Sequence, residues 1–199
     1  LAGPLFTQAE QEVIRDPSSR SREQKERSER RVEQALAAAD RHDSGADKAA
    51  DWCLSQKGVT EKPLGSNWGE PVQTWITFCG FTVPVFWCGC FNAYGAMKIA
   101  GAKVKYPTVL THNTEMLRYA DAGGYGVERV SISEARRGDI VSFTFAHIGM
   151  LLGPIENGRL STIEGNTSAQ GQVSNGGGVY EHNDRTTSLV QGIVRPDYS

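Results

Sequence analysis

The sequence lacks any run of about 18 apolar residues, the length that a membrane-spanning helix requires, so we predict no membrane insertion. It also lacks a basic segment at its start, so we expect no signal peptide, and the missing initiator Met suggests a processed or excised piece. Its charges nearly cancel, with a net charge of −2 over 199 residues. This balance gives no basis for predicting a nucleic-acid partner.

Cysteine is scarce, and its spacing does not suit a metal site. The four cysteines are Cys53, Cys79, Cys88 and Cys90. A Cys-x-Cys pair is not a usual zinc spacing, and no paired histidines or second close cysteine pair accompany it, so we predict no metal and no other cofactor. Cys88 and Cys90 are too close for an unstrained disulfide, whereas a Cys53–Cys79 bridge stays open at this point.

The composition otherwise suits one domain with a substantial core, because 39% of the residues are hydrophobic. Asp16-Pro17 is a favourable helix start, and nearly every residue from 18 to 31 is polar or charged. A helix without an apolar stripe in that stretch is expected to be solvated. Asp43-Ser44-Gly45 is expected to break it, so residues 1–42 are predicted to form a charged helical spacer or linker, and residues 43–199 a separate domain.

After this break, the pattern predicts helices first and strands later. The expected helices cover residues 46–57, a short stretch around 72–76, 88–100 and 112–121. The expected strands cover residues 140–145, 148–152, 160–164, 178–182 and 189–194. Asn157-Gly158, between the second and third strands, is a strong hairpin turn signal. Helices followed by an antiparallel meander predict an α+β fold with a sheet of about five strands.

Cys88 stands at the predicted start of a helix. Pro84 restrains Val83 to extended geometry, so the helix cannot begin before that point. Unpaired backbone N–H groups and the helix dipole favour a thiolate at a helix N-terminus, which suits a nucleophilic cysteine. The alternative is a small buried hydrophobe in a core helix.

A cysteine nucleophile needs a base within hydrogen-bond reach, and four histidines are candidates. His42 is expected in the polar linker, His112 at a surface helix start and His182 in a turn. His147 differs, because it opens a strand within an apolar run. We take His147 as the candidate base, the alternative being a hydrogen-bonded core histidine.

Two polar residues, Glu164 and Asn166, are candidates to orient that base. Alternation along a strand puts both on one face of the sheet. A carboxylate inside an apolar sheet needs a partner, and the predicted hairpin brings His147 and Glu164 nearly opposite each other. We expect Glu164 to accept from the His147 nitrogen that faces away from Cys88. The alternative is that residues 164–166 form a polar turn.

Seven short motifs recur in an order and spacing typical of one family. They are GSNWGEPV (65–72), WCGCF (87–91), GDIV (138–141), HIG (147–149), TIEGNT (162–167), NGGGV (175–179) and GIVRP (192–196). In these motifs, residues 45–198 resemble a CHAP domain, the cysteine, histidine-dependent amidohydrolase/peptidase family of cell-wall lysins.

The resemblance implies a papain-like fold in which the nucleophile helix packs on an antiparallel sheet. It implies that Cys88 is the nucleophile, His147 the general base, and Glu164 and Asn166 the groups that orient and stabilise the imidazole. Trp87, beside the nucleophile, is a candidate for substrate binding. Some relatives carry an acidic calcium loop before the nucleophile, but residues 80–86 contain no acid, so the calcium site is not carried over.

The implied partner is bacterial peptidoglycan, cut at an amide bond by an N-acetylmuramoyl-L-alanine amidase or a peptide endopeptidase. The expected place of action is the bacterial cell wall, with the chain a phage virion component or a lysin released from the host cytoplasm. No wall-binding repeat is found, so targeting would come from elsewhere, such as a larger lysin or virion protein. The alternatives are a papain-like protease on protein substrates and a catalytically silent wall-binding or virion module.

Overall fold

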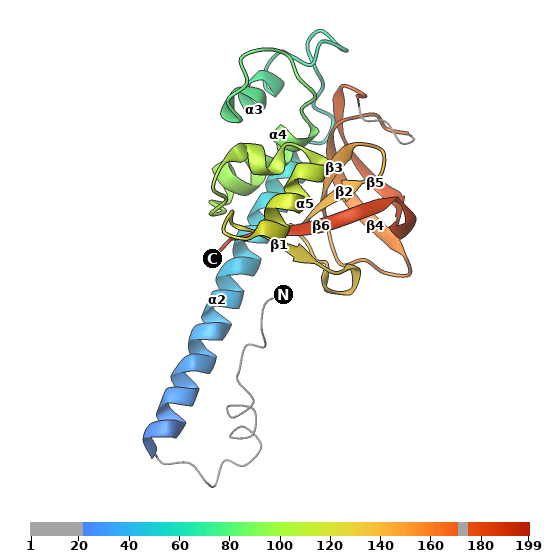
Figure 1. Ribbon diagram of the computed structural model, residues 1–199. Coiled ribbons are helices and arrows are strands. Elements are labelled where there is room, and N and C mark those ends of the chain that lie inside the picture. The colour runs from blue at the N-terminus through green and yellow to red at the C-terminus, as the bar shows by residue number, and fades with distance from the viewer. Residues whose placement is uncertain (1–21, 171–174) are drawn as a thin grey trace. The chain divides into compact units, whose positions relative to one another are not determined.

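The computed structural model describes residues 22–170 and 175–199 (Figure 1). The contacts within the chain divide it into two units, residues 1–41 and 42–199. The predicted helix start at Asp16-Pro17 lies outside the described residues. The assignment of residues 1–42 as a spacer stays a prediction.

Helix α2 (Arg22–Ser55) runs without interruption, so the predicted break at Asp43-Ser44-Gly45 is wrong. Gly45 does not end the helix but allows another segment to pack closely against it. A Cβ atom at Gly45 would lie 2.7 Å from Cβ of Tyr198, so the missing side chain lets the C-terminal segment lie against the helix. Beyond Gly45 the helix buries Ala46, Ala49, Ala50 and Cys53. Burial of this face outweighs the weak helix propensity of the Asp-Ser-Gly sequence.

The other α-helices of the described chain agree in place with the predicted ones. They are α3 (Val72–Phe78), α4 (Cys88–Ala93) and α5 (Asn113–Ala122). Helix α4 continues as a π-helical segment, Tyr94–Ile99, which Ala100 caps before Gly101 with φ 77°. The predicted helix from Cys88 therefore exists, with a wider last part.

Within residues 22–170 and 175–199, six antiparallel strands form one sheet in the order β1-β6-β2-β3-β4-β5. The strands are β1 (Val127–Val130), β2 (Ile140–Phe143), β3 (His147–Leu151), β4 (Arg159–Thr167), β5 (Gly178–Thr186) and β6 (Val190–Pro196). Helices precede the sheet in the chain, so the α+β class is confirmed. All five predicted strands are present. Strand β1 was not predicted, because its Val-Glu-Arg-Val sequence is short and polar; it is an edge strand held by β6.

The predicted hairpin at Asn157-Gly158 is confirmed. Both residues have positive φ, 50° and 73°, as a two-residue hairpin turn requires. The turn joins β3 and β4, which pair with Met150 opposite Ile163. This register fixes which side chains of the two strands lie beside each other.

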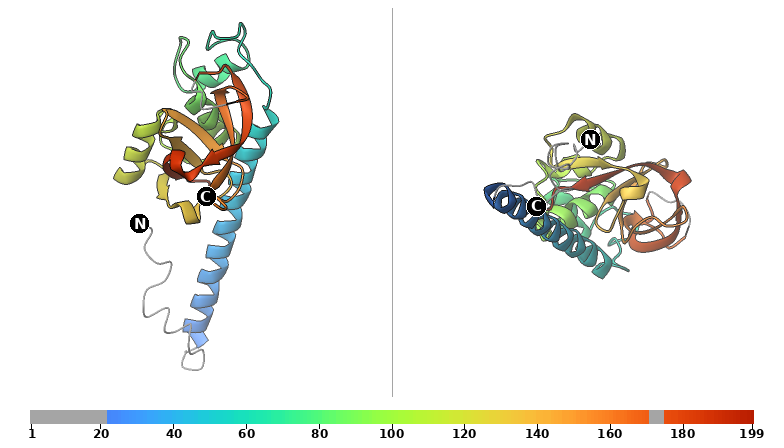
Figure 2. Two further views of the ribbon diagram at one scale, coloured as in Figure 1. Left: turned by 90° about the vertical axis from the view of Figure 1, so that its right-hand side faces the viewer. Right: turned by 90° about the horizontal axis from the view of Figure 1, so that it is seen from below.

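The sheet has apolar side chains on both faces. The larger cluster includes Ile148, Met150 and Ile163 and packs against the helices, while a smaller cluster includes Val141 and Leu151. Figure 2 shows that the sheet is strongly curved. The site residues thus come from a sheet that is covered on both faces.

Helix α4 approaches β4 closely at Gly165. A Cβ atom there would lie 2.7 Å from Cζ3 of Trp87 and 2.8 Å from Cβ of Phe91. Trp75 completes an aromatic cluster with these two rings, at centroid distances of 5.4 Å and 5.1 Å. Glycine at position 165 therefore sets how near the start of α4 lies to the sheet.

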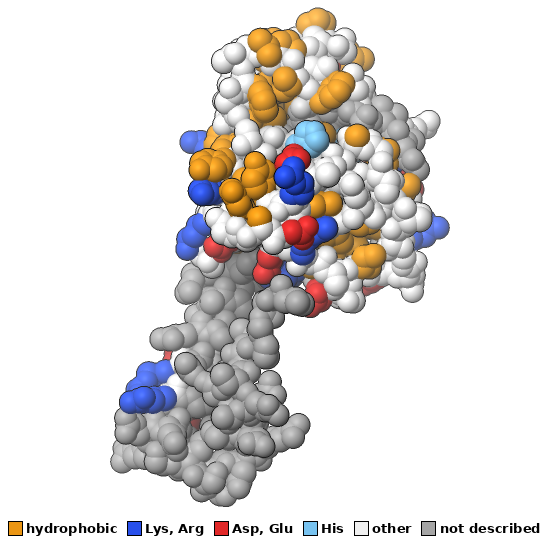
Figure 3. Space-filling model, viewed as in Figure 1, with side chains coloured by type: hydrophobic (Ala, Val, Ile, Leu, Met, Phe, Trp, Pro, Cys, Tyr) orange, Lys and Arg blue, Asp and Glu red, His pale blue; other side chains and the backbone are white. Residues whose placement is uncertain are grey.

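Large hydrophobic side chains are also found on the surface. Figure 3 shows them spread over the upper part of the visible face, where α3 and its flanking loops lie. The large exposed hydrophobic residues of the described chain are Val32, Leu64, Val83, Phe86, Tyr106 and Ile132. None of the described helices has the length and apolar character needed to cross a membrane.

The packing at Gly165 generates a stability prediction. Gly165→Ala should lower the free energy of unfolding by about 1–3 kcal/mol, because the added methyl group overpacks the contact with Trp87 and Phe91. Gly153→Ala is the matched control, since no atom lies within 4 Å of a Cβ built there. Denaturant unfolding of both variants tests this, and equal midpoints would contradict the close approach.

Candidate active site

Cys88 is the first residue of α4 and is 7% exposed. The side chain of Asn92, one turn later, donates to the Cys88 carbonyl oxygen at 2.9 Å and to the Ile148 carbonyl oxygen at 3.4 Å. Because Ile148 directly follows His147 in β3, this fully buried asparagine ties the start of the helix to the start of the strand. The predicted position of Cys88 at a helix start is confirmed.

His147 is the first residue of β3 and is fully buried. Ala146, with φ 56°, makes the tight turn from β2 that brings the histidine into the strand. The imidazole lies nearly parallel to the rings of Phe143 and Phe145, with an interplanar angle of 16° to each. The two aromatic rings therefore fix the plane of the imidazole.

Glu164, in β4, reaches His147 diagonally across the hairpin. Its Oε2 lies 3.1 Å from His147 Nε2, an ion-pair distance, although the N–H points too far aside for a straight hydrogen bond. Extending the register by one residue puts Gly149 opposite Glu164, and a Cβ at Gly149 would lie 2.9 Å from Glu164 Cγ. The glycine leaves room for the glutamate to lean toward the histidine, as diagonal neighbours can.

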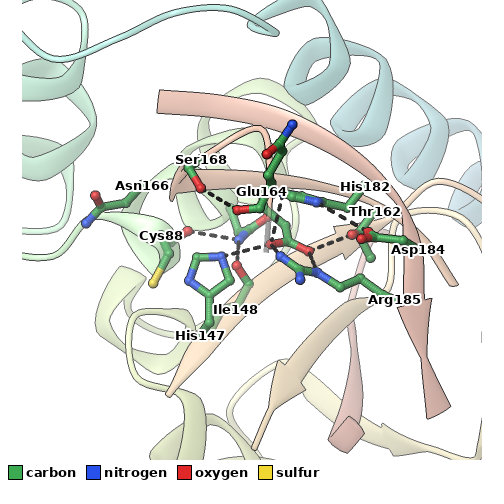
Figure 4. A network of polar contacts seen from close by, with 12 residues as sticks. Cys88, His147, Ile148, Thr162, Glu164, Asn166, Ser168, His182, Asp184 and Arg185 are labelled. Carbon is green, nitrogen blue, oxygen red and sulfur yellow. Dashed lines mark hydrogen bonds and ion pairs between the residues drawn. The ribbon is translucent and has the colours of Figure 1, made fainter. Parts of the chain in front are cut away.

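Figure 4 shows the imidazole of His147 lying between the side chains of Cys88 and Glu164. One nitrogen of the His147 ring faces Glu164, and the other lies on the side of the Cys88 sulfur. The structure therefore brings together the predicted nucleophile, base and carboxylate. The nitrogen that faces the carboxylate is the one turned away from the thiol, which is the orientation that a thiol–imidazole–carboxylate triad requires.

The surroundings of Cys88 favour its thiolate. Burial alone raises the pKa of the thiol, but the His147 imidazole and backbone hydrogen bonds from Ile148 and Gly89 lower it further than burial raises it. The net pKa of Cys88 lies below its ordinary value of 9.0. A thiol with a lowered pKa beside an imidazole is the arrangement of an activated nucleophile.

The pKa of His147 is raised and that of Glu164 is lowered. Burial lowers the pKa of His147, but the Cys88 thiolate and then Glu164 raise it to about 9. Burial raises the pKa of Glu164, but the hydrogen bonds from Arg185 and the neighbouring His147 imidazole lower it to about 2. At neutral pH His147 is therefore an imidazolium and Glu164 a carboxylate, and the lowered pKa of Cys88 favours its thiolate beside them.

Arg185, in β5, is part of this site and was not predicted from the sequence. Its Nε lies 2.9 Å from Glu164 Oε1, and its Nη2 lies 2.7 Å from Glu164 Oε2. Thr162 adds a hydrogen bond of 2.7 Å to Oε1. A buried arginine is the residue type best suited to hold a carboxylate with two parallel bonds. The predicted strand ends at His182, whereas β5 continues to Thr186 and so includes Arg185.

His182 also differs from its predicted place in a turn. It lies within β5 opposite Thr162 and is 3% exposed. Its Nε2 is 3.8 Å from Glu164 Oε2, and its Nδ1 is 3.5 Å from Asp184 Oδ1. A second imidazole therefore borders the same carboxylate.

Asn166 is buried but does not lie beside the imidazole. Its φ of 57° and a register shift after Glu164 break the alternation that would have put both residues on one face. Its amide nitrogen donates to Asn67 Oδ1 at 3.0 Å, and its Oδ1 accepts from the Gly177 N–H at 3.4 Å. Figure 4 shows its side chain directed away from His147. Its described partners join β4 to two loops.

Trp87 is a core residue. It is fully buried, its ring packs on Trp75 and Phe91, and its indole N–H donates to Glu61 Oε1 at 2.7 Å. The prediction that Trp87 contacts substrate does not match this placement. The tryptophan instead supports the backbone from which Cys88 begins.

The cysteines are all unbridged, so a Cys53–Cys79 disulfide is not formed. Burial raises the pKa of the Cys53 thiol. A hydrogen bond with Cys79, together with burial, raises the pKa of Cys90. Cys88 differs from Cys53 and Cys90 in that its surroundings favour the thiolate. Among residues 22–170 and 175–199, no group of three or more His, Cys, Asp or Glu side chains could hold a metal ion.

No family model and no curated protein matches this chain.

The thiol environments lead to a reactivity prediction. Iodoacetamide should modify Cys88 faster than the other three cysteines at neutral pH, because its thiolate is stabilised by His147. His147→Ala should move the onset of Cys88 alkylation to higher pH. Peptide mapping by mass spectrometry over a pH series measures both effects. Modification of Cys90 or Cys53 before Cys88 would show that the assignment is wrong.

The contact at Gly149 leads to a second prediction. In Gly149→Ala, the methyl group should push the Glu164 carboxylate from His147 and so lower the pKa of the imidazole from about 9 toward its ordinary 6.5. An NMR titration of the imidazole follows this shift, with Gly153→Ala as the control. An unchanged titration would mean that the carboxylate does not depend on the space at Gly149.

Proposed function

We propose that this chain is a cysteine-dependent amide hydrolase of the CHAP type, with a papain-like arrangement of helix and sheet, and that it acts on peptidoglycan. The observation that supports this most is the Cys88–His147–Glu164 chain of contacts, in which the pKa of the thiol is lowered and that of the imidazole raised. A cysteine that only fills space in the core would not need to lie beside an imidazole that is itself paired with a carboxylate. The complete set also argues against a catalytically silent module.

In the proposed acylation step, the Cys88 thiolate attacks the carbonyl carbon of the substrate amide. Backbone N–H groups at the start of α4 stabilise the oxyanion that forms. The His147 imidazolium then gives its proton to the leaving nitrogen, the C–N bond breaks, and an amine departs. A thioester on Cys88 and a neutral imidazole remain.

In the proposed deacylation step, neutral His147 takes a proton from water, and the hydroxide attacks the thioester carbonyl. The C–S bond breaks, which releases the carboxylic acid product and restores the thiolate and the imidazolium. Glu164 stays ionised throughout and stabilises the imidazolium that is present before acylation and forms again in deacylation. The raised pKa of His147, about 9, keeps the proton donor available at neutral pH.

Peptidoglycan as substrate rests on the resemblance of the ordered motifs to cell-wall lysins. Within that class, we propose cleavage of either the muramoyl-alanine amide or a peptide bond of the stem or cross-bridge. The proposed place of action is the bacterial cell wall, for a phage virion component or a lysin. Targeting would then come from a larger assembly.

The test is digestion of purified peptidoglycan, with the released termini identified by mass spectrometry. New muramoyl-lactyl ends indicate an amidase, and new amino termini within peptides indicate an endopeptidase. Cys88→Ala and His147→Ala should each abolish release, Glu164→Gln should be next in severity, and Asn166→Ala least. Cleavage of casein without release from any wall type would contradict the substrate proposal and favour a protein protease.

The ranking of Glu164 above Asn166 has its own check. Because triad members act as a unit, changing His147 and Glu164 together should lower kcat little more than His147→Ala alone does. If Asn166→Ala abolishes turnover while Glu164→Gln retains most of it, Asn166 is the orienting residue. That result would also require a rearrangement, because the described partners of Asn166 are Asn67 and Gly177.

A further inference from the structure

Four buried groups of the site balance one another when each of them is charged. Cys88 as thiolate and Glu164 as carboxylate carry two negative charges, and His147 as imidazolium and Arg185 as guanidinium carry two positive charges. Glu164, His147 and Arg185 are each at most 1% exposed, and Cys88 is 7% exposed. Charges removed from water in this way are tolerated only when they are paired.

Arg185 also shares its packing with the base. Its guanidinium carbon lies 5.6 Å from the ring centre of Phe143 and 5.2 Å from that of Phe145, within the range of a cation–π contact. The same two rings lie parallel to the imidazole of His147. The arginine, the aromatic pair and the histidine are therefore held in one packed group.

We propose that Arg185 is a positioning residue for the proposed hydrolysis: its two-bond grip on Glu164 fixes the carboxylate toward His147 and balances the charge of the thiolate–imidazolium pair. This inference rests on the proposed function for its catalytic meaning. Its charge and its geometry make separate contributions. The positive charge keeps the buried cluster neutral, and the planar fork sets the direction of Oε2.

Other titratable groups face the same carboxylate and must be considered. From β5, His182 lies 3.8 Å from Glu164 Oε2, with Asp184 3.5 Å beyond it. From β3 and α4 the facing groups are His147 and Cys88. The Asp184 side chain is 67% exposed, so water screens its charge, whereas His182 is buried. The experiment therefore includes a His182→Gln background.

The direction of the expected change follows from simple electrostatics. Removing a positive charge from a buried cluster makes it harder to form a thiolate there, and removing a negative charge makes it easier. Arg185→Gln should therefore move the onset of Cys88 alkylation to higher pH by about one unit. Glu164→Gln should move it to lower pH, and the double variant should return it close to that of the parent protein.

The experiment measures the pH dependence of Cys88 alkylation by iodoacetamide, which needs no substrate. The variants are Arg185→Gln, Arg185→Lys, Glu164→Gln and the double Arg185→Gln/Glu164→Gln. Arg185→Lys keeps the charge but loses the fork. It should leave the alkylation profile in place while lowering kcat for hydrolysis by about tenfold with little change in KM.

Arg195 provides a matched control. It holds Asp139 with the same two-bond geometry, at 2.9 Å for each bond, but in β6 outside the site. Arg195→Gln should lower stability without moving the alkylation profile of Cys88. A purely structural role for Arg185 predicts that the two arginine variants behave alike.

The proposal is overturned if folded Arg185→Gln keeps the parent alkylation profile, or if the double variant shows no return relative to the single ones. Should Arg185→Gln fail to fold, the comparison of Glu164→Gln with the double variant decides, since the second change must move the onset back to higher pH. The change in alkylation onset caused by Arg185→Gln must also appear when it is made in the His182→Gln background. If the predicted shifts occur but no amide is hydrolysed, the proposed function alone is contradicted. If hydrolysis is normal but the shifts are absent, the role of Arg185 alone is contradicted.

Discussion

A carboxylate without access to water is the constraint around which this sheet is arranged. Glu164 is fully buried, and an isolated carboxylate in that position would lose its charge. Its two oxygens are instead met by side chains from its own strand and from both neighbouring strands: Thr162 from β4, Arg185 from β5 and His147 from β3. The order β3-β4-β5 in the sheet is therefore also the order in which the charges are paired.

The local parts of this arrangement could be predicted from the sequence. The hairpin at Asn157-Gly158 follows from the preference of these residues for positive φ, and it brings the strands of His147 and Glu164 side by side. The start of a helix at Cys88 follows from the upstream proline and the apolar spacing. These features depend on a few neighbouring residues, which is why sequence patterns contain them.

The missed parts depend on contacts between distant segments. Arg185 meets Glu164 only because β5 pairs with β4 in one particular register, which no local pattern sets. Helix α2 continues through Gly45 because Tyr198, at the other end of the chain, packs there. Asn166 leaves the expected face because a single left-handed residue interrupts the strand, and alternation assumes a regular one.

The side chains of the site are positioned by two separate segments of the chain. His147 and Glu164 are positioned by one short, continuous piece of chain, whereas the sulfur is delivered by a separate helix that Asn92 fastens to β3 through backbone oxygens. None of the described contacts that hold the helix in place uses the thiol group. Another small side chain at position 88 would therefore leave the packing of α4 and the contact between His147 and Glu164 in place. The residue at position 88 can thus be changed without removing the contacts that hold the helix and the sheet together.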